Sequence, residues 1–438
     1  MSFALRRMAV CLQRWPQLVA IYLVGLLARD GAIGLAAWAG HDNDVWASLI
    51  MPLAVLARLG ALVAMLLVLR PCFPELSVAA AQPRRPINVF ASVIVPAFAI
   101  YLGWQMFKED WLAFEARALG YRVGEAISSA NPAEVHFDSF PNSRTTVVII
   151  IAALVIRLVL RLLGDNLPRW TALLKIYIDS LWVFLVLTFS ASEGVKLITN
   201  PGGWVKERRV VVWLDSVINS LIAPFHPLQV AWQATCEATR LLLGSAAVPL
   251  IWLVIAGIVY GVSTRTSWVS AGRRVVGERA DTMLEHITRR GQKVHSRWQS
   301  MPEKVREKTR DDAADQLGKY RPIAEAGRLI AHAGVLGLAV YVLAYLALAW
   351  LDMSGSYYSG QLAPGYLFRG MAKLLGPHPF EFWAGIDGTL KLLSHIIIEP
   401  LRVCVVATAF AYCVHHASAA TATATADLQR EPNQNPTI

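Results

Sequence analysis

The chain is poor in charge: 16% of its 438 residues are charged, whereas 55% are hydrophobic. A typical soluble protein has about 25% charged residues, so this composition excludes a chain that folds in water with a polar surface. The sequence also lacks a phosphate-binding glycine loop, a metal-ligand spacing and a nucleophile constellation. No catalytic residue, cofactor or metal is therefore predicted, and an enzyme is less favoured than a non-catalytic protein.

Cysteine is scarce as well. The five cysteines are Cys11, Cys72, Cys236, Cys404 and Cys413. No two of them form a C-x-x-C pair, and their number is odd. This pattern excludes a disulfide framework and a zinc site of ordinary spacing.

Long apolar stretches are abundant. Eight of them span residues 15–40, 46–69, 87–107, 145–164, 173–198, 244–262, 329–351 and 395–414. A helix needs about 20 residues to cross the hydrocarbon of a bilayer, and each stretch is close to that length. The predicted fold class is all-α: a polytopic integral membrane protein with about eight transmembrane helices in four hairpins.

The distribution of Lys and Arg predicts the orientation. Basic residues gather before the first stretch and in alternate connections, and fifteen lie within residues 264–328. Cytoplasmic loops carry this excess, so both termini are expected in the cytoplasm and the protein in the plasma (inner) membrane. Residues 108–143 carry more acid than base and are expected on the outer face. A cleaved signal peptide is the alternative for the first stretch, but Arg29 and Asp30 interrupt it.

Two pairs of sparse residues recur at equal spacing and indicate an internal repeat. An aromatic residue lies 11 positions before a proline at Trp213/Pro224 and Tyr366/Pro377, and a tryptophan lies 17 positions before one at Trp232/Pro249 and Trp383/Pro400. Both units point the same way, which predicts a parallel repeat with outer-face amphipathic helices. Transporters use the seam between such repeats, but a duplicated structural hairpin is equally compatible.

These observations divide the chain into six parts. They are an N-terminal hairpin (1–86), a second hairpin with an extracytoplasmic loop at 108–143 (87–172), a first repeat unit (173–263), a basic cytoplasmic segment (264–328), a second repeat unit (329–416) and a disordered tail (417–438). The basic segment is expected to form a helical hairpin that contacts anionic lipids or docks a protein partner. No motif supports nucleic-acid binding.

Charged residues lie deep inside the first two stretches. Arg29, Asp30 and Arg58 fall at similar depth when counted from the ends of their hairpin. A lone charge there costs about 3 kcal/mol, so we expect the three to form a buried cluster with surplus positive charge that binds an anionic group. The alternative is a clasp between helices in which Asp179 or Glu399 meets the third charge.

Further charges lie in other stretches. Arg157 and Arg161 share one helical face, and an ion pair between Arg161 and Asp179 is expected near the inner interface. Glu399 and Arg402 flank a proline in the last stretch, which would make that helix the more polar wall of any pathway.

Two histidines occupy matching places in the repeat. His226 and His378 each precede a proline, and Trp232 and Trp383 follow at similar distance. This outer-face motif is interpreted as a rigid turn, because no further ligand spacing accompanies the histidines. The leading functional hypothesis is transport or permeation of a small or anionic solute, a lipid included. The alternatives are a non-catalytic subunit or scaffold of a membrane complex and a lipid-processing enzyme.

Overall fold

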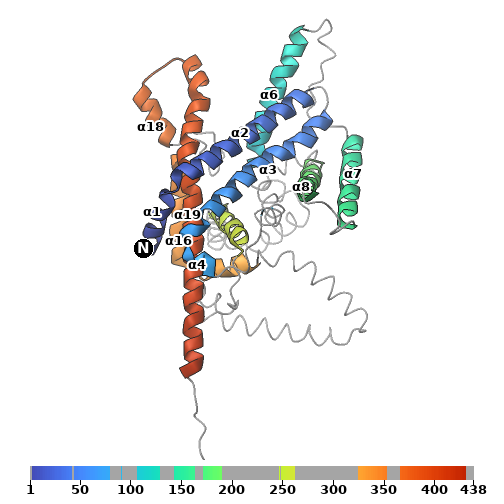
Figure 1. The fold of residues 1–438 in the computed structure, drawn as a ribbon. Helices are drawn as coiled ribbons and strands as arrows, with labels where there is room; N and C mark the ends of the chain where they lie inside the picture. Colours follow the sequence, from blue (N-terminus) through green and yellow to red (C-terminus); the bar gives the residue numbers. More distant parts are fainter. Residues whose placement is uncertain are drawn as a thin grey trace, which may run out of the picture. The chain divides into compact units, whose positions relative to one another are not determined.

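The computed structural model describes residues 2–41, 44–78, 90, 106–128, 143–162, 171–189, 246, 248–261, 324–352 and 366–430. Over these residues the chain is helical and has no strand (Figure 1). Four of the described helical segments are long and apolar enough to cross a membrane: Trp15–Gly40, Val45–Cys72, Gly334–Leu351 and Gly388–Ala419. The predicted all-α fold is therefore confirmed for the described residues, and the four candidate spans are consistent with the predicted membrane class, whereas eight spans in four hairpins stay a prediction.

Within the part of the chain that the structure describes, eleven helical elements carry labels in Figure 1 or in the text. They are α1 (Ser2–Leu12), α2 (Trp15–Gly40), α3 (Asp44–Leu69), the 3₁₀ turn η1 (Arg70–Cys72), α4 (Pro74–Val78), α6 (Met106–Ser128), α7 (Ser143–Leu162), α8 (Thr171–Phe189), α16 (Gly334–Leu351), α18 (Tyr366–Leu375) and α19 (Phe380–Arg430). A shorter apolar helix covers Val248–Tyr260. Most of the predicted third span, the first repeat unit and the basic cytoplasmic segment lie outside the described residues.

The chain divides into two compact units. The first unit comprises Met1–Leu18, Met65–Arg84 and Pro249–Ile438. The second unit comprises Val19–Ala64 and Arg85–Val248. These two units are defined by contacts in space. They do not test the division into six parts, which was made from the sequence and stays a prediction.

Small residues bring α2 and α3 together in the second unit. Gly25 of α2 lies directly against Ala61 of α3, and Gly40 lies against Ala47 near the turn. Such small residues allow two membrane helices to approach closely, since lipid and leucine are equally apolar and packing must supply the attraction. The same unit contains the packed pair α7 and α8, and Tyr177 of α8 donates a hydrogen bond to the carbonyl of Leu49 at 2.8 Å.

Helix α19 organises the first unit. It contacts α1, α4, α16 and α18, and Figure 1 shows it as the long orange-red helix. Tyr260 stacks on Phe410 with ring centroids 5.8 Å apart, and the hydroxyl of Tyr341 donates to the carbonyl of Pro249 at 2.7 Å. These contacts fix α16 and the Val248–Tyr260 helix against α19.

Two boundary predictions are wrong. Helix α16 begins at Gly334 rather than at 329, because Gly334 adopts a left-handed φ of 75° that breaks the helix. Helix α19 is continuous from Phe380, so Pro400 lies in its interior rather than near its start. Membrane helices tolerate such a proline when neighbouring elements satisfy the freed carbonyl.

The tail prediction is also wrong in part. Residues 417–430, expected to be disordered, continue α19 as helix to Arg430. Alanine has the highest intrinsic helix propensity and recurs through this stretch, which gives the extension a local cause.

Candidate functional site

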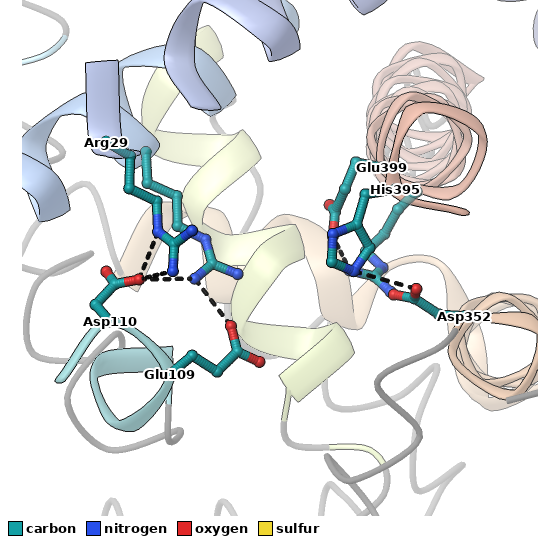
Figure 2. A network of polar contacts seen from close by, with 8 residues as sticks. Arg29, Glu109, Asp110, Asp352, His395 and Glu399 are labelled. Atoms are coloured by element: carbon teal, nitrogen blue, oxygen red, sulfur yellow. Dashed lines mark hydrogen bonds and ion pairs between the residues drawn. The ribbon is translucent and has the colours of Figure 1, made fainter. Parts of the chain in front are cut away.

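The deepest charges of the second unit converge on one carboxylate, Asp110 of α6. Its side chain is 0% exposed. Nε of Arg29 on α2 donates a hydrogen bond to its Oδ1 at 2.5 Å, and Nη1 of Arg58 on α3 lies 3.7 Å from the same oxygen (Figure 2). Two guanidinium groups from different helices therefore meet on a single oxygen atom.

Neighbouring carboxylates complete the network. Arg58 also donates to Oε2 of Glu109 at 3.1 Å. Asp30 pairs with Arg117 of α6, whose two Nη atoms lie 2.5 Å from Oδ1 and 2.9 Å from the main-chain oxygen of Asp30. These contacts join three arginines to three carboxylates, and the charges of these six side chains balance.

The expected surplus of positive charge is therefore wrong. Asp30 does not neutralise Arg29 or Arg58 in this structure; it pairs with Arg117, while α6 supplies Glu109 and Asp110 to the two intramembrane arginines. The alternative, an ion-pair clasp between helices, named Asp179 or Glu399 as the partner of the unpaired arginine. Its partners are also wrong, because Glu109 and Asp110 pair with the arginines.

Hydrogen bonds at two levels tie α6 to α2 and give the two helices the same sense. Asp110 meets Arg29 at one end, and Arg122 donates to the carbonyl of His41 at 3.3 Å at the other. These pairs are twelve residues apart on each helix (29 to 41, 110 to 122), a rise of about 18 Å on both. Glu109 lies in the first turn of α6, where a carboxylate complements the positive end of the helix dipole.

Sequence reasoning missed the acidic half of this site. It assigned Glu109 and Asp110 to an outer loop, because charge lowers the apparent hydropathy of that segment. One available signal was that this acidic pair lies only two residues after the third apolar stretch, and charges close to a membrane segment usually have partners.

A second polar cluster lies in the first unit, between the end of α16 and the middle of α19. Asp352 directly follows α16 and is 2% exposed; its Oδ2 lies 3.1 Å from Nη2 of Arg402. Its Oδ1 accepts a hydrogen bond from Ser394 at 3.1 Å. The same oxygen lies 3.3 Å from Nε2 of His395 (Figure 2). Arg402 also donates to Glu399 at 2.5 Å.

The electrostatics of Asp352 favour its ionised form. Burial raises the pKa of this carboxyl, but the hydrogen bond from His395 and the charges of His395 and Arg402 outweigh burial, so that the pKa lies well below its usual range. Tyr345 covers the guanidinium of Arg402, whose carbon lies 5.5 Å from the ring centroid. The sequence indicated Glu399 and Arg402 as polar residues of the last span, but it missed Asp352.

The remaining predicted charges form a separate ion pair. Nε of Arg157 on α7 lies 2.7 Å from Oδ1 of Asp179 on α8, and its guanidinium also lies over the ring of Trp182. Asp179 therefore pairs with Arg157, one turn before the predicted partner Arg161. The side chain of Arg161 lies outside the described residues.

The histidine motif has a structural explanation at its second copy. Gly376 adopts a φ of 83° at the end of α18, and Nε2 of His378 lies 3.0 Å from the carbonyl of Leu375. Trp383 donates its indole N–H to the carbonyl of His378 at 3.1 Å. His226 and Trp232 lie outside the described residues. Among the residues that the structure does describe, no group of three or more His, Cys, Asp or Glu side chains could hold a metal ion.

No protein-family model matches this chain, and neither a curated protein nor a solved structure matches it. A functional hypothesis therefore depends on the geometry of the two clusters. Chemically, the first presents paired guanidinium groups to an anion, and the second joins a buried carboxylate to an imidazole.

Proposed function

We propose that this protein transports a small anionic solute across the plasma (inner) membrane and that Arg29 and Arg58 bind it. The observation that supports the proposal is the convergence of both guanidinium groups on Oδ1 of Asp110. Guanidinium groups pair equally well with the carboxylate or phosphate of a solute. Asp110 would hold the place of the solute while none is bound.

The exposure of the side chains suggests where the solute enters. Asp110 is fully buried, whereas Arg29 and Arg58 are 18% and 21% exposed and Glu109 is 36% exposed. A solute would approach beside Glu109 and replace the carboxylates one at a time. Such an exchange never leaves an arginine unpaired, which would cost about 3 kcal/mol in the membrane interior.

The proposed architecture has eight spans in four hairpins, a parallel repeat and both termini in the cytoplasm. The direction of α6 supports a crossing between α3 and α6: α6 runs parallel to α2, so its C-terminal end lies on the same side as Gly40. The basic segment 264–328 would contact anionic lipids or a protein partner on the cytoplasmic side.

Flux measurements on the purified chain in liposomes test the proposal. The probes are iodide, inorganic phosphate, acetate and succinate, each compared with protein-free liposomes. We expect flux of at least one anion, and a loss of about tenfold or more in Arg29→Ala and Arg58→Ala, because removing one partner of a buried charge pair costs about 2–5 kcal/mol.

Arg369→Ala is the matched control. It removes an exposed arginine of α18 that lies over the ring of Tyr366. Arg369 is far from Arg29 and Arg58 in the sequence and belongs to the first unit, whereas they belong to the second. The flux of this variant should equal that of the unmodified chain. Unchanged flux in Arg58→Ala would contradict the site assignment, and absence of flux for all four probes would contradict transport of small anions.

A second candidate function is that of a non-catalytic subunit of a membrane complex. Helix α19 has 51 residues, a length of about 75 Å at 1.5 Å per residue, whereas the hydrocarbon is about 30 Å thick. Its ends would therefore project beyond the bilayer and could hold a partner. Purification from the native membrane in mild detergent, followed by mass spectrometry, distinguishes a stoichiometric partner from a self-contained protein.

A further inference from the structure

We propose that Asp352, His395, Glu399 and Arg402 form a proton-binding site between α16 and α19, in which His395 takes up the proton. This site belongs to the first unit, whereas Arg29, Arg58 and Asp110 belong to the second. The inference therefore stands independently of the proposed anion transport.

The charges of the four side chains favour uptake of one proton. Counted by themselves, the two carboxylates and one arginine carry a charge of −1 with a neutral imidazole and zero with an imidazolium. Asp352 and Arg402 are both buried, and a buried net charge is unfavourable because it has lost its hydration. Protonation of His395 removes this imbalance.

The geometry prepares Asp352 to stabilise an imidazolium. Ser394 and Arg402 hold the carboxylate from two other directions, so its Oδ1 stays 3.3 Å from Nε2 of His395. Glu399 lies one helical turn after His395 on the same face of α19. The low pKa of Asp352 supports the same assignment, since it keeps the carboxylate charged while the histidine titrates.

His395 can exchange its proton with the surroundings, whereas Asp352 cannot do so directly. The imidazole is 29% exposed and the carboxylate 2% exposed. Histidine is also the side chain whose ordinary pKa, about 6.5, lies in the physiological range. The imidazole therefore connects the buried carboxylate to bulk pH.

The other charged groups on the packed elements include one cation close to His395, which opposes its protonation as Glu399 favours it. Helix α16 contains no Asp, Glu, Lys, Arg or His between residues 334 and 351. On α1 and α4, Arg7 and Glu75 pair with each other, and α1 meets α19 farther along, where Met8 contacts Thr408. Helix α18 carries two cations, Arg369 and Lys373, and α19 carries Lys391 one turn before His395.

Thermal unfolding of the purified full-length chain in detergent, measured from pH 5 to pH 8, tests the proposal. The imidazolium stabilises the folded chain through Asp352, so the unfolding midpoint should be steady below about pH 6.5, the ordinary pKa of histidine, and should fall as the pH rises above it. In His395→Gln this fall should be lost. His378→Gln, which changes an exposed histidine of the turn after α18, should retain it.

Glu399→Gln provides a second measurement, the pH at which the unfolding midpoint falls. A merely structural role of the cluster would leave that pH unchanged. The substitution removes one negative charge, so the pH at which the midpoint falls should shift down by about one unit. Equal pH dependence in the unmodified chain and in His395→Gln would overturn the proposal. If His395→Gln does not fold, an unshifted profile in Glu399→Gln would overturn it instead.

Discussion

Arg29 and Asp110 are 81 residues apart in the sequence, and Nε of the arginine donates to Oδ1 of the carboxylate at 2.5 Å. The contact ties α6 to α2 at the level of the deepest charges of the α2–α3 hairpin. It also changes the electrostatic interpretation of that hairpin. The sequence predicted that Arg29 and Arg58 carry surplus positive charge, whereas in the structure both lie at the carboxylate of Asp110. An added solute anion would therefore compete with Asp110 for the arginines.

The first prediction follows from this competition. Asp110→Asn should lower the unfolding midpoint, because two partly buried arginines lose their shared carboxylate, and breaking a buried pair from one side costs about 3–5 kcal/mol. Millimolar phosphate or succinate should recover part of the lost stability by occupying the vacated position. The measurement is thermal unfolding in detergent with and without the anion.

Glu125→Gln is the matched control for that experiment, because Glu125 is exposed near the far end of the same helix. It should change neither the midpoint nor the response to anions. A loss of stability in Asp110→Asn that no anion recovers would favour a purely structural clasp.

The second prediction concerns the close approach of α2 and α3. A Cβ added at Gly25 would collide with the Cβ of Ala61, which is fixed to its backbone, whereas a Cβ at Gly31 of the same helix meets nothing within 4 Å. Gly25→Ala should therefore lower the unfolding midpoint. Gly31→Ala should leave it unchanged or raise it slightly, since alanine is favoured over glycine in a helix by about 1 kcal/mol. Equal midpoints in the two variants would contradict the observed packing of the hairpin.

Hydrophobic length predicted the helices that carry the arginines. The first stretch, 15–40, has the bounds of α2, and the second, 46–69, ends with α3 at Leu69. Such stretches are predictable because a membrane helix must satisfy its own backbone and so requires a continuous apolar run of fixed length. The end of α16 at Leu351 was predictable for the same reason.

The partners of the charges were not predictable in this way. Depth along a span showed that Arg29 and Arg58 need anionic partners, but depth alone does not distinguish Asp110 from Asp30, Asp179 or Glu399. Asp352 was overlooked because it is one residue beyond the apolar stretch that ends α16. Such pairings depend on how helices that are distant in the sequence pack together. The pattern of apolar and charged residues along the chain does not show that packing.

The third prediction uses the electrostatics of Asp352. The pKa of this carboxyl is lower in the folded chain than in the unfolded chain, so its contribution to stability is present above about pH 4 and is lost as the pH falls through the folded-state value. Asp352→Asn should therefore be less stable than the unmodified chain at pH 6. The difference between their unfolding midpoints should shrink as the pH is lowered from 5 to 3. A difference independent of pH would contradict a stabilising role for the ionised form.

The fourth prediction tests the direction of α6 in the membrane. Because α6 runs parallel to α2, and α2 is expected to run outward, Glu125 should face the outside together with the turn after Gly40. That placement requires a third crossing between α3 and Glu125, because the two apolar helices described ahead of α6 would return the chain to the cytoplasm. Glu125→Cys should therefore react with a membrane-impermeant maleimide added to intact cells.

Arg6→Cys is the reference for that experiment, because it should react only after the membrane is permeabilised. Both variants are made in a chain with Cys236→Ser, so that the remaining native cysteines are Cys11, Cys72, Cys404 and Cys413, all of them buried. Labelling of Glu125→Cys only after permeabilisation would contradict the third crossing. It would also place the acidic end of the arginine network on a segment that enters from the cytoplasmic side, so that a solute would reach Arg29 and Arg58 from within the cell rather than from outside.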